Sequence, residues 1–405
     1  MPIDVARLRA DTPGCEEVVH LNNAGAAMMP TPVADAVVDH VRLEARLGGY
    51  EAAAAAADAI EAARTSVACL IGADPPDVAL TQSDTASWTK AFWGLALGGW
   101  FDGGGRVLVD RASYSSHHLS LLQARGRFGF TVEIVDSTDD GVIDLEDLDR
   151  RLDGSVRLVT ATHVGTHRGL VNPVADVGAR TSAAKVPYFL DACQSAGQLP
   201  VDVGAISCDV ATGTGRKFLR APRGTGWLWV RPEWAERMEP PGIDTRSAES
   251  RSEESYVLGE RARRFEEFET SYAARIGLGI ATQYALLIGI AAIADRIGRL
   301  AEDLRDSLEG IGAAVHDGGR ERCGIVTFTV PGRDPRVIRD SLSASGINVS
   351  VTDANFAPLD MASRGLRSAV RASPHVYNTD EELERLVDRV REEIDGPGSE
   401  AGPSR

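Results

Sequence analysis

Lysine is scarce in this sequence. Among the 43 residues that are lysine or arginine, the lysines are Lys90, Lys185 and Lys217. A guanidinium keeps its proton at any physiological pH, whereas a lysine amine loses its proton when it is partly buried or lies near another cation. Arginine therefore cannot replace lysine where an amine must act as a nucleophile or a base. Lys217 lies in the segment "ATGTGRKFLRAPRGTG" (211–226), among glycines and threonines.

Closely spaced cysteines are also missing. The five cysteines are far apart and form no CxxC pair, so the sequence predicts no zinc or other metal site. They are Cys15, Cys69, Cys193, Cys208 and Cys323. Scattered cysteines are typical of proteins in a reducing compartment, and we expect a cytoplasmic protein with free thiols.

Long apolar runs are absent as well. The first residues, "MPIDVARLRADTPG", contain no apolar stretch, which predicts that there is no signal peptide. The longest apolar stretch, 276–294, is interrupted by Thr282, Gln283 and several glycines, and we expect a buried helix and no membrane span. The net charge of −16 argues against nucleic acid or an anionic membrane as a partner and is explained by solubility.

The sequence does contain a regular alternation of short apolar runs with helix-compatible stretches. Seven runs are typical of strands: "DVALTQ", "GRVLVD", "FTVEIVD", "VRLVTATH", "VPYFLDA", "CDVATGT" and "GTGWLWV". This alternation predicts an α/β fold with a mostly parallel seven-stranded sheet and helices on both faces. The last run follows a turn rich in glycine and proline, so it is the candidate for an antiparallel strand.

The C-terminal part has a different order. "GIVTFTV", "RVIRDSLSASG", "INVSV", "RSAVRASPH" and "TDEELERLVDRVREEI" predict strand, helix, strand, strand and helix, which indicates a small α+β domain. We divide the chain into an N-terminal arm (1–30), a large domain (31–296), a small domain (297–395) and a disordered tail (396–405). An alanine-rich helix is expected at 51–72, and another helix near 276–296 leads into the small domain.

Polar residues follow four of the predicted strands. Asp191 follows "YFL", and Arg216 and Lys217 follow "DVATGT". The segments 83–87 and 163–166 follow two further strands, and the first of these opens a helix. In open α/β sheets, ligands bind beyond the carboxyl ends of the strands. A carboxylate, an amine and a helix start suited to an anion are therefore expected to face one cleft.

Pyridoxal phosphate needs this combination of groups. Its aldehyde is held by a lysine imine, its ring nitrogen pairs with a carboxylate, and its phosphate binds the N–H groups of a helix start. Arg216 would lower the pKa of the neighbouring amine or bind phosphate. An ordinary surface lysine at 217 is the alternative, which Asp191, upstream at the end of another strand, disfavours.

Together these stretches resemble the fold-type I pyridoxal-phosphate enzymes of the class V aminotransferase group, which includes the cysteine desulfurases. The resemblance covers nearly the whole chain, from "HLNNAGAAMMP" through "DACQSAGQLPVDV" and "ATGTGRKFLRAPRGTGWLWV" to "VRASPHVYNTDEEL". It implies pyridoxal 5'-phosphate as cofactor and a small amino acid as substrate. It also implies a homodimer with the active site near the subunit interface.

The resemblance further implies roles for single residues. Lys217 would hold the cofactor and act as a base, Asp191 would pair with the ring nitrogen, and Tyr114 would stack on the ring. The remaining cofactor contacts would be Gln194 to the ring 3-hydroxyl, Thr166 near a cofactor oxygen, and Ser83, Asp84, Thr85, Thr214 and Arg216 around the phosphate. The substrate contacts would be Asn23 in the arm, His167, and Arg371 as a fork for the substrate carboxylate.

Structural roles remain open for some of these residues. Tyr114 could pack in the core, Asn23 could belong to a turn, and Arg371 could be a surface charge. His167, beside the cleft with Arg168, would either shape substrate choice or hold the structure. His117 and His118 receive no role.

Two departures from the resemblance narrow the reaction. Desulfurases of this group have a mobile catalytic cysteine shortly before the substrate-clamping arginine, and "NVSVTDANFAPLDMASRGLRSAVRAS" contains no cysteine. "RRFEEFET" stands where desulfurases have a Gly-Thr pair that reaches the partner's phosphate, so this cross-subunit contact stays open. The segments "TGRKFLRAPRGTGWLWVR", "INVSV" and "LDMASRGL" are most similar to the branch of hercynylcysteine sulfoxide lyases and isopenicillin N epimerase-like proteins.

We therefore expect a pyridoxal-phosphate-dependent C–S β-lyase that cleaves an S-substituted cysteine, a sulfoxide or thioether conjugate, in secondary or thiol metabolism. Transamination, epimerisation and decarboxylating oxidative deamination of a cysteine-derived amino acid are alternatives, because each reaction begins at the same Cα. A scaffold that binds the cofactor without turnover is a further alternative, which the presence of Lys217, Asp191 and Arg371 disfavours.

Overall fold

The larger part of the protein is built on a seven-stranded sheet. The computed structural model describes residues 3–396, and its large sheet has the strand order β2-β8-β7-β6-β5-β3-β4. In this order the strands are β2 (Val78–Thr81), β8 (Gly226–Val230), β7 (Val210–Thr214), β6 (Tyr188–Asp191), β5 (Val156–Thr162), β3 (Gly105–Val109) and β4 (Phe130–Ile134). All seven predicted strands are confirmed. As expected, β8 runs antiparallel to both of its neighbours, while the other neighbouring pairs are parallel.

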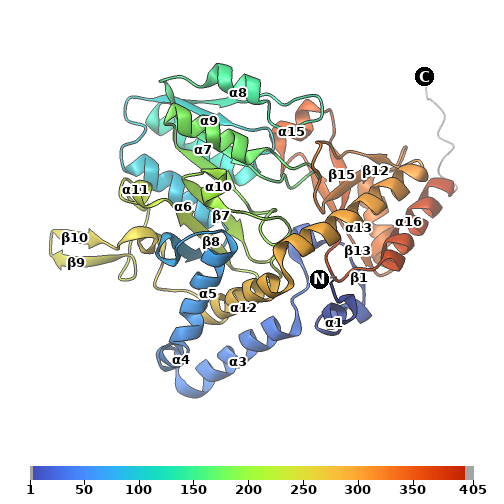
Figure 1. Ribbon diagram of the computed structural model, residues 1–405, viewed down its shortest axis with the longest axis horizontal. Helices are drawn as coiled ribbons and strands as arrows, with labels where there is room; N and C mark the ends of the chain where they lie inside the picture. Colours follow the sequence, from blue (N-terminus) through green and yellow to red (C-terminus); the bar gives the residue numbers. More distant parts are fainter. Residues whose placement is uncertain (1–2, 397–405) are drawn as a thin grey trace.

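Helices cover both faces of this sheet (Figure 1). The helices α5 (Ala57–Leu70), α9 (Val174–Ala184) and α12 (Tyr272–Ile288) share one apolar core, and α6 (Asp84–Leu97) and α7 (Ser115–Phe128) share the other. Successive strand residues point to opposite faces, so Phe189 belongs to one core and its neighbour Leu190 to the other. The sheet is therefore buried on both sides, which explains why its strands are continuous apolar runs.

Two of the expected helices are interrupted. The alanine-rich stretch forms α4 (Gly49–Ala55) and α5, with a turn at Ala56 between them. The apolar stretch forms α12 and α13 (Ile290–Gly310), separated by Gly289, whose φ of +92° suits glycine. These two helices are bent by 80° at the break, and they reach the length and composition of a membrane span only when joined across it. Among residues 3–396, no single helix reaches both.

The small domain contains a four-stranded antiparallel sheet with its own core. Its order is β11 (Ala314–Val315), β12 (Val326–Thr329), β15 (Ser368–Ala372) and β14 (Ser350–Asp353). The helices α13, α14 (Pro335–Ala344) and α16 (Asp380–Asp395) pack on this sheet. The run expected as one strand at 347–351 is divided, because β13 (Ile347–Asn348) pairs with β1 (Val19–His20) while β14 pairs with β15.

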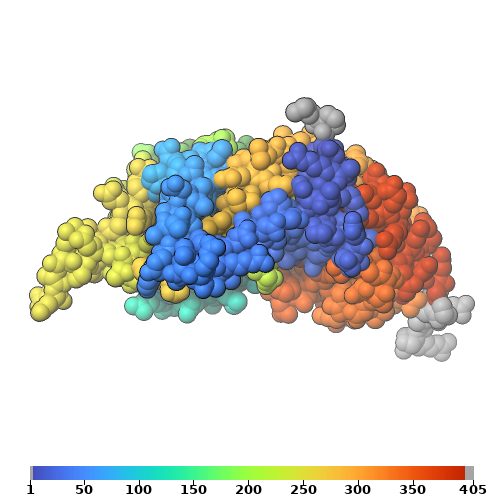
Figure 2. Space-filling view, turned by 90° about the horizontal axis from the view of Figure 1, so that it is seen from below, coloured from blue at the N-terminus to red at the C-terminus, as the bar shows by residue number. Residues whose placement is uncertain are grey.

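The remaining elements are short helices and strands between those already named, together with the helices of the N-terminal part. They are α1 (Val5–Ala10), η1 (Pro13–Glu16), α2 (Asn23–Ala26), α3 (Thr31–Leu47), η2 (Pro75–Asp77), α8 (Leu145–Arg151), α10 (Val203–Ile206), α11 (Pro232–Ala235), β9 (Ala248–Ser252), β10 (Ser255–Leu258), η3 (Arg261–Phe265) and α15 (Pro358–Ser363). The hairpin of β9 and β10 projects from the end of the large domain, and the N-terminal helices run across one face toward the small domain (Figure 2).

The domain division proposed from the sequence falls inside a continuous helix. Along α13, Ile293 and Ile297 belong to a core of the large domain, whereas Leu300 and Leu304 belong to the core of the small domain. The two cores therefore meet between Ile297 and Leu300, and the domain boundary at 296/297 stays a proposal. The tail predicted to be disordered lies, beyond Gly396, outside the described residues.

Candidate active site

A pocket lies at the carboxyl ends of the parallel strands. It is lined by Ser83, Asp84, Thr85, Ala112, Tyr114, Thr162, Val164, Thr166, Asp191, Cys193, Gln194, Thr214, Arg216 and Lys217. Every residue expected to contact the cofactor lies on this pocket. The wall residues that the sequence reasoning did not single out are Ala112, Thr162, Val164 and Cys193.

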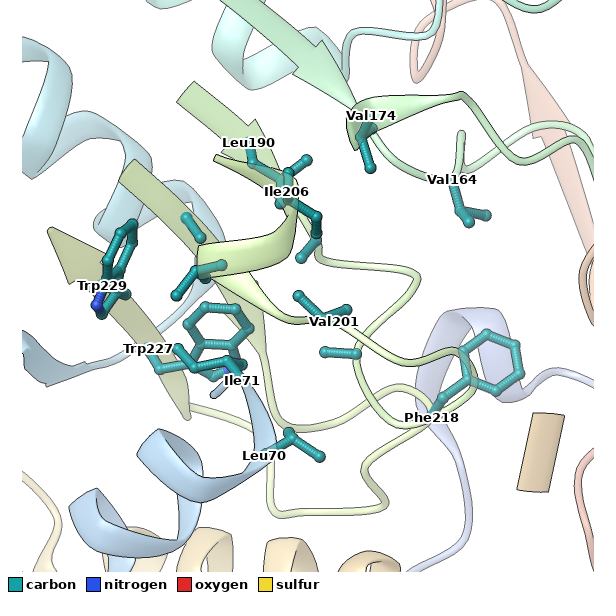
Figure 3. Packing of buried hydrophobic residues seen from close by; sticks show 14 of the residues in the cluster. Leu70, Ile71, Val164, Val174, Leu190, Val201, Ile206, Phe218, Trp227 and Trp229 are labelled. Atoms are coloured by element: carbon teal, nitrogen blue, oxygen red, sulfur yellow. The ribbon is translucent and has the colours of Figure 1, made fainter. Parts of the chain in front are cut away.

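The apolar core holds the pocket residues through their chain neighbours. Leu190 precedes Asp191, Phe218 follows Lys217, and Val164 lies on the loop after β5; each is at most 1% exposed. Figure 3 shows these three side chains among the buried residues of one core. Because packed apolar side chains permit little movement, the polar residues beside them keep fixed positions.

Lys217 differs from the two other lysines of the chain. Its side chain is buried, its Nζ lies 3.2 Å from Cys193 Sγ, and it makes no ion pair with a carboxylate among residues 3–396. Its Nζ also lies 6.0 Å from the centre of the Tyr114 ring. In contrast, Lys90 Nζ pairs with Glu267 at 2.7 Å, and Lys185 is exposed at the end of α9. Lys217 is thus the lysine whose amine faces the pocket.

Asp191 is buried at the end of β6. One carboxylate oxygen accepts the backbone N–H of Cys193 at 2.8 Å, and the other lies 3.6 Å from His117 Nδ1. Burial and the nearby charge of Asp84 raise the pKa of Asp191, while His117 opposes this rise. A carboxylate in this position can pair with a protonated ring nitrogen.

His117 is a residue of this site to which the sequence reasoning gave no role. It lies in the first turn of α7, its Nε2 is 3.0 Å from Asp84 Oδ2, and its ring stacks on Trp88 with centroids 4.7 Å apart. The nearest nitrogen and oxygen atoms of Asp84, His117 and Asp191 lie within 4.8 Å of one another. For His117, the only signal in the sequence was its closeness to Tyr114.

The phosphate end of the pocket is formed by the start of α6. Ser83 caps this helix, with its Oγ accepting the N–H of Ala86 at 3.1 Å, and the first N–H groups of a helix have no carbonyl partner within it. A Cβ on Gly226 would lie 2.5 Å from the backbone of Ser83, so glycine lets β8 approach this helix start closely. An anion is favoured here by both the N–H groups and the helix dipole.

The side chains around the start of α6 differ in whether they can bind a phosphate. Thr214 Oγ1 donates to the Thr225 carbonyl at 3.0 Å, and Thr85 Oγ1 lies 3.1 Å from Ser116 Oγ. Arg216 donates to the Gly25 carbonyl of the N-terminal arm. Asp84 is the exception, because its carboxylate faces His117 and would repel a phosphate. A phosphate contact at residue 84 is therefore proposed for the backbone N–H alone.

Gln194 lines the pocket with a side chain whose hydrogen bonds are incomplete. Gln194 Nε2 donates to the Ala24 carbonyl and to Thr166 Oγ1, both at 3.1 Å, while its Oε1 is buried without a partner. A buried unpaired acceptor is costly, so this oxygen is prepared for a donor such as a ring hydroxyl.

Arg371, on β15, lies behind Thr166 with its charge unpaired. Its Nη1 donates to the carbonyl and Oγ1 of Thr166 at 2.7 and 2.8 Å, and its Nε donates to Ser350 Oγ at 3.1 Å. It makes no ion pair with any carboxylate of residues 3–396, and burial together with Arg216 lowers its pKa to about 10. A buried cation without a counter-ion is well suited to bind an anionic group of a substrate.

None of the residues expected to bind substrate lines the pocket itself: Arg371 lies behind the wall residue Thr166, and the side chains of Asn23 and His167 are held elsewhere. Asn23 Nδ2 donates to the Ser373 carbonyl at 2.7 Å and its Oδ1 accepts the hydroxyl of Tyr377, so its side chain is occupied. His167 is buried with its Nε2 2.9 Å from Asp360 Oδ2 of the small domain. We therefore correct both expectations: the arm reaches the site through the carbonyls of Ala24 and Gly25, and His167 contacts the small domain.

Comparison with known proteins agrees with this geometry. The profile of the family described as aminotransferase class V matches residues 19–386. This chain belongs to the aminotransferase class V family. It is a pyridoxal-phosphate-dependent enzyme of the cysteine desulfurase-like group and has the fold-type I architecture.

Individual relatives cover nearly the whole chain. A probable cysteine desulfurase of Methanothermobacter thermautotrophicus is 29% identical over 96% of this chain and 98% of its own length. A probable hercynylcysteine sulfoxide lyase of Mycobacterium tuberculosis is 31% identical over 92% of this chain and 89% of its own length. The apo structure of a cysteine desulfurase from Thermococcus onnurineus NA1 superposes with a TM-score of 0.90 at 28% identity, over 97% of this chain and 98% of the other.

The pocket of this class V enzyme has the groups that pyridoxal phosphate needs: an acceptor, an amine and the N–H groups of a helix start. The unpaired Gln194 Oε1, the Lys217 amine without a carboxylate partner and the helix start at Ser83 lie on one cavity. We propose that Lys217 holds the aldehyde carbon, that Asp191 faces the ring nitrogen, and that Tyr114 covers the ring.

Proposed function

We propose that this enzyme is a C–S β-lyase that cleaves an S-substituted cysteine, a sulfoxide or thioether conjugate, in secondary or thiol metabolism. This proposal is carried by the composition and the anchoring of the segment between β14 and β15. It contains no cysteine, and its Asp360 is bound to Arg168 at 3.0 Å and to Arg364 at 3.0 Å. A segment anchored in this way and lacking a thiol does not suit the delivery of a cysteine to the substrate sulfur.

The other cysteines do not replace the missing thiol. Cys323 is buried, and burial raises the pKa of its thiol to about 12. Cys193 does line the pocket, but burial and the nearby Asp84 raise the pKa of its thiol as well. Since the thiolate is the nucleophile, neither residue is set up to accept sulfur as a persulfide.

The substrate carboxylate is proposed to bind Arg371. The guanidinium presents parallel N–H groups that match a carboxylate, and Thr166 and Ser350 hold the other donors in place. This contact orients the amino acid so that its Cα lies toward Lys217. The repulsion between Arg371 and Arg216 is relieved when an anion enters.

We propose that Lys217 moves the proton and that Asp191 stabilises the charge in this reaction. When bound, pyridoxal phosphate supplies an electron-accepting ring joined to the substrate amine. Lys217 Nζ takes the proton from Cα, and the carboxylate of Asp191 stabilises the positive ring nitrogen. The Cβ–S bond then breaks with its electron pair going to sulfur, which leaves as a thiolate or sulfenate. The three-carbon fragment leaves as 2-aminoacrylate, which water converts to pyruvate and ammonia.

The assay that tests this reaction uses a panel of S-alkyl and S-aryl cysteines and their sulfoxides, with products identified by mass spectrometry. A C–S lyase releases pyruvate and one sulfur product in equal amounts without any keto acid. Alanine and a persulfide from cysteine would instead identify a desulfurase. Dependence on an added keto acid would identify an aminotransferase, and either result would contradict the proposal.

The role of Lys217 gives the first prediction. Borohydride reduction of the holoenzyme followed by peptide mapping should find the cofactor on residue 217. Lys217→Ala should lower kcat by about 10²- to 10⁴-fold, because both the attachment point and the base are lost. Lys185→Arg, at an exposed position, should retain wild-type kcat, and an adduct on Lys90 or Lys185 would refute the site.

We also propose that the enzyme is a cytoplasmic homodimer with the pocket near the subunit interface. All five cysteines are free, which suits a reducing compartment. Large apolar side chains are exposed on α3, on α4 and before α12: Val38, Val41, Leu47, Tyr50 and Phe268. Apolar side chains gathered at a surface are typical of interfaces.

A further inference from the structure

Three buried side chains meet at the pocket: Asp84 from α6 and Asp191 from β6, which line it, and His117 from α7, which does not. Their nearest nitrogen and oxygen atoms lie within 4.8 Å of one another, and each side chain is at most 7% exposed. We propose that His117 is a positioning residue: as an imidazolium it joins the two carboxylates and keeps Asp191 ionised and directed into the pocket. This inference rests on the proposed pairing of Asp191 with the ring nitrogen, and it holds for any bond that the enzyme breaks at Cα.

The geometry places a carboxylate on each side of the imidazole ring. His117 Nε2 lies at hydrogen-bond distance, 3.0 Å, from Asp84 Oδ2, and Nδ1 lies 3.6 Å from Asp191 Oδ2, beyond a hydrogen bond but within the range of an ion pair. An ionised carboxylate can only accept, and a neutral imidazole has one N–H, so the doubly protonated ring suits both neighbours. The ring plane is set by Trp88, which stacks on it at an angle of 10°, and by the edge of Tyr114.

The charges around His117 also require a cation. The charged groups around it are the carboxyls of Asp84, Asp191 and Asp110, and Lys217 lies close enough to Asp84 and Asp191 to act on both. Two carboxylates so close together in a buried site cannot both stay ionised without a positive charge between them. These acids raise the pKa of His117 although its burial acts in the opposite direction.

Other buried histidines of the chain show what happens without such neighbours. Burial lowers the pKa of His163 to about 4, and burial with the nearby Arg220 lowers that of His375 to about 3. His167 has one carboxylate partner, Asp360, but also faces Arg168 and Arg364, and its pKa is lowered. His117 differs from all three because it lies between carboxylates with no arginine beside it.

The surroundings of Asp191 have a consequence for the cofactor. The Cys193 N–H donates to one oxygen at 2.8 Å, and a charged His117 lies 3.6 Å from the other. The hydrogen bond orients the carboxylate, and the imidazolium charge favours its ionised form, which faces a positive ring nitrogen. Without His117, Asp84 would repel Asp191 and favour its protonated form.

The decisive experiment reads the protonation of His117 directly in the apoprotein. Nitrogen-15 NMR of histidine-labelled protein distinguishes an imidazolium from a neutral ring. The His117 signal is the one lost in His117→Gln and kept in His118→Gln, a half-buried neighbour on the same helix. At pH 7 we expect His117 to be doubly protonated while His163 and His375 are neutral. Asp84→Asn should make His117 lose its proton at a lower pH.

The holoenzyme gives a second reading. His117→Gln and His117→Phe, which keeps the stacking on Trp88, should lower kcat by about 10- to 100-fold, the range found for residues that orient a primary ligand. KM should change little because Arg371 still binds the substrate. Asp84→Asn should move the alkaline limb of the kcat profile to lower pH. His118→Gln should leave the rate unchanged.

Several results would overturn the proposal: a neutral His117 at pH 7, a titration that Asp84→Asn does not move, or a wild-type kcat for His117→Phe. If His117→Gln does not fold, the wild-type and Asp84→Asn titrations decide the question. The NMR reading needs no substrate, so a failure of the C–S lyase proposal leaves it standing. A neutral His117 in an active lyase would refute this inference alone.

Discussion

At the scale of single residues, Arg371 shows how a site can be prepared for a ligand at the expense of stability. A guanidinium buried without a counter-ion costs several kcal/mol, whereas one bound to a carboxylate recovers much of this cost. Thr166 and Ser350 accept some of its N–H groups, but no carboxylate of residues 3–396 neutralises its charge. The substrate is then the natural counter-ion.

Replacing Arg371 should therefore separate binding from stability. Arg371→Gln should raise KM for the amino acid by about 10- to 100-fold, since a hydrogen bond to a charged group contributes about 1.5–3 kcal/mol. The melting temperature of the apoprotein should stay the same or rise, because an unpaired buried charge is removed. Steady-state kinetics and calorimetry measure the two effects. Arg367→Gln, at an exposed position on the same segment, is the control and should change neither.

At the scale of secondary structure, the start of α6 is positioned by a contact that only glycine permits. The Cβ of an alanine at 226 would lie 2.5 Å from the backbone of Ser83, closer than any packed carbon comes. The helix start would have to move away from β8. Since its N–H groups are proposed to bind the phosphate, the cofactor should be affected first.

Gly226→Ala should thus weaken cofactor binding and lower the free energy of unfolding by about 1–3 kcal/mol, the usual cost of overpacking. Equilibrium dialysis with pyridoxal phosphate and urea denaturation measure the two quantities. Gly242→Ala is the matched control, because a Cβ there has no neighbour within 4 Å. An unaltered cofactor affinity in Gly226→Ala would argue against phosphate binding at this helix start.

The helix α15 is attached to the large domain by one carboxylate. Asp360 accepts from Arg168 of the loop after β5, lies 2.9 Å from His167 of the same loop, and also binds Arg364. The hydrogen bond to His167 and the charges of Arg168 and Arg364 hold the pKa of Asp360 well below its usual range, against the effect of burial. His167, expected to face the substrate, therefore connects the domains.

Asp360→Asn should destabilise the fold at neutral pH by about 3 kcal/mol, because the buried Arg168 and the half-buried Arg364 lose their counter-ion. A carboxyl whose pKa is lowered in the folded state stabilises above its unfolded pKa, and this stabilisation is lost as the pH falls from about 4 toward the folded value. The difference between wild type and variant in urea should thus shrink in acid. Asp340→Asn, which removes an exposed pair with Arg339, should cost less than about 1 kcal/mol.

At the scale of the whole molecule, the chain has a high net negative charge and an apolar surface region around Tyr50. Tyr50 is 74% exposed and its ring lies 6.3 Å from that of Phe268, on segments far apart in the sequence. The net charge of −16 keeps copies apart unless an apolar area brings them together. These residues are where we expect a second copy of the chain to bind.

The protein should sediment at twice its chain mass of 43.1 kDa. Tyr50→Glu should shift the equilibrium toward the monomer, because a charge would be buried without a partner in the interface. Val337→Glu is the control, since Val337 is exposed to a similar degree on α14 of the small domain. A wild-type monomer, or an undisturbed dimer in Tyr50→Glu, would contradict the location of the interface.

The strands, and the meeting of Asp191 with Lys217, could be predicted from the sequence for physical reasons. Strands buried on both faces must be continuous apolar runs, and their carboxyl ends must share one edge of a parallel sheet. Asp191 and Lys217 directly follow such strands, so their meeting follows from local patterns. The alanine-rich stretch carried less information, because alanine is compatible with a helix and with the turn found at Ala56.

Other contacts join segments that no local pattern relates. His117 meets Asp84 and Asp191 only because α6, α7 and β6 converge. The residues next to His117 in the sequence do not predict this contact. Asn23 and His167 are close in sequence to residues at the pocket. Their side chains, however, contact Tyr377 and Asp360. The sequence alone determined the fold class and singled out Lys217 and Asp191 as the proposed cofactor lysine and its acid, since these depend on hydrophobic periodicity and on residue types that chemistry cannot exchange. The tertiary structure decided which polar side chains face the pocket and which hold the protein together, because that depends on the directions in which packed elements point their side chains.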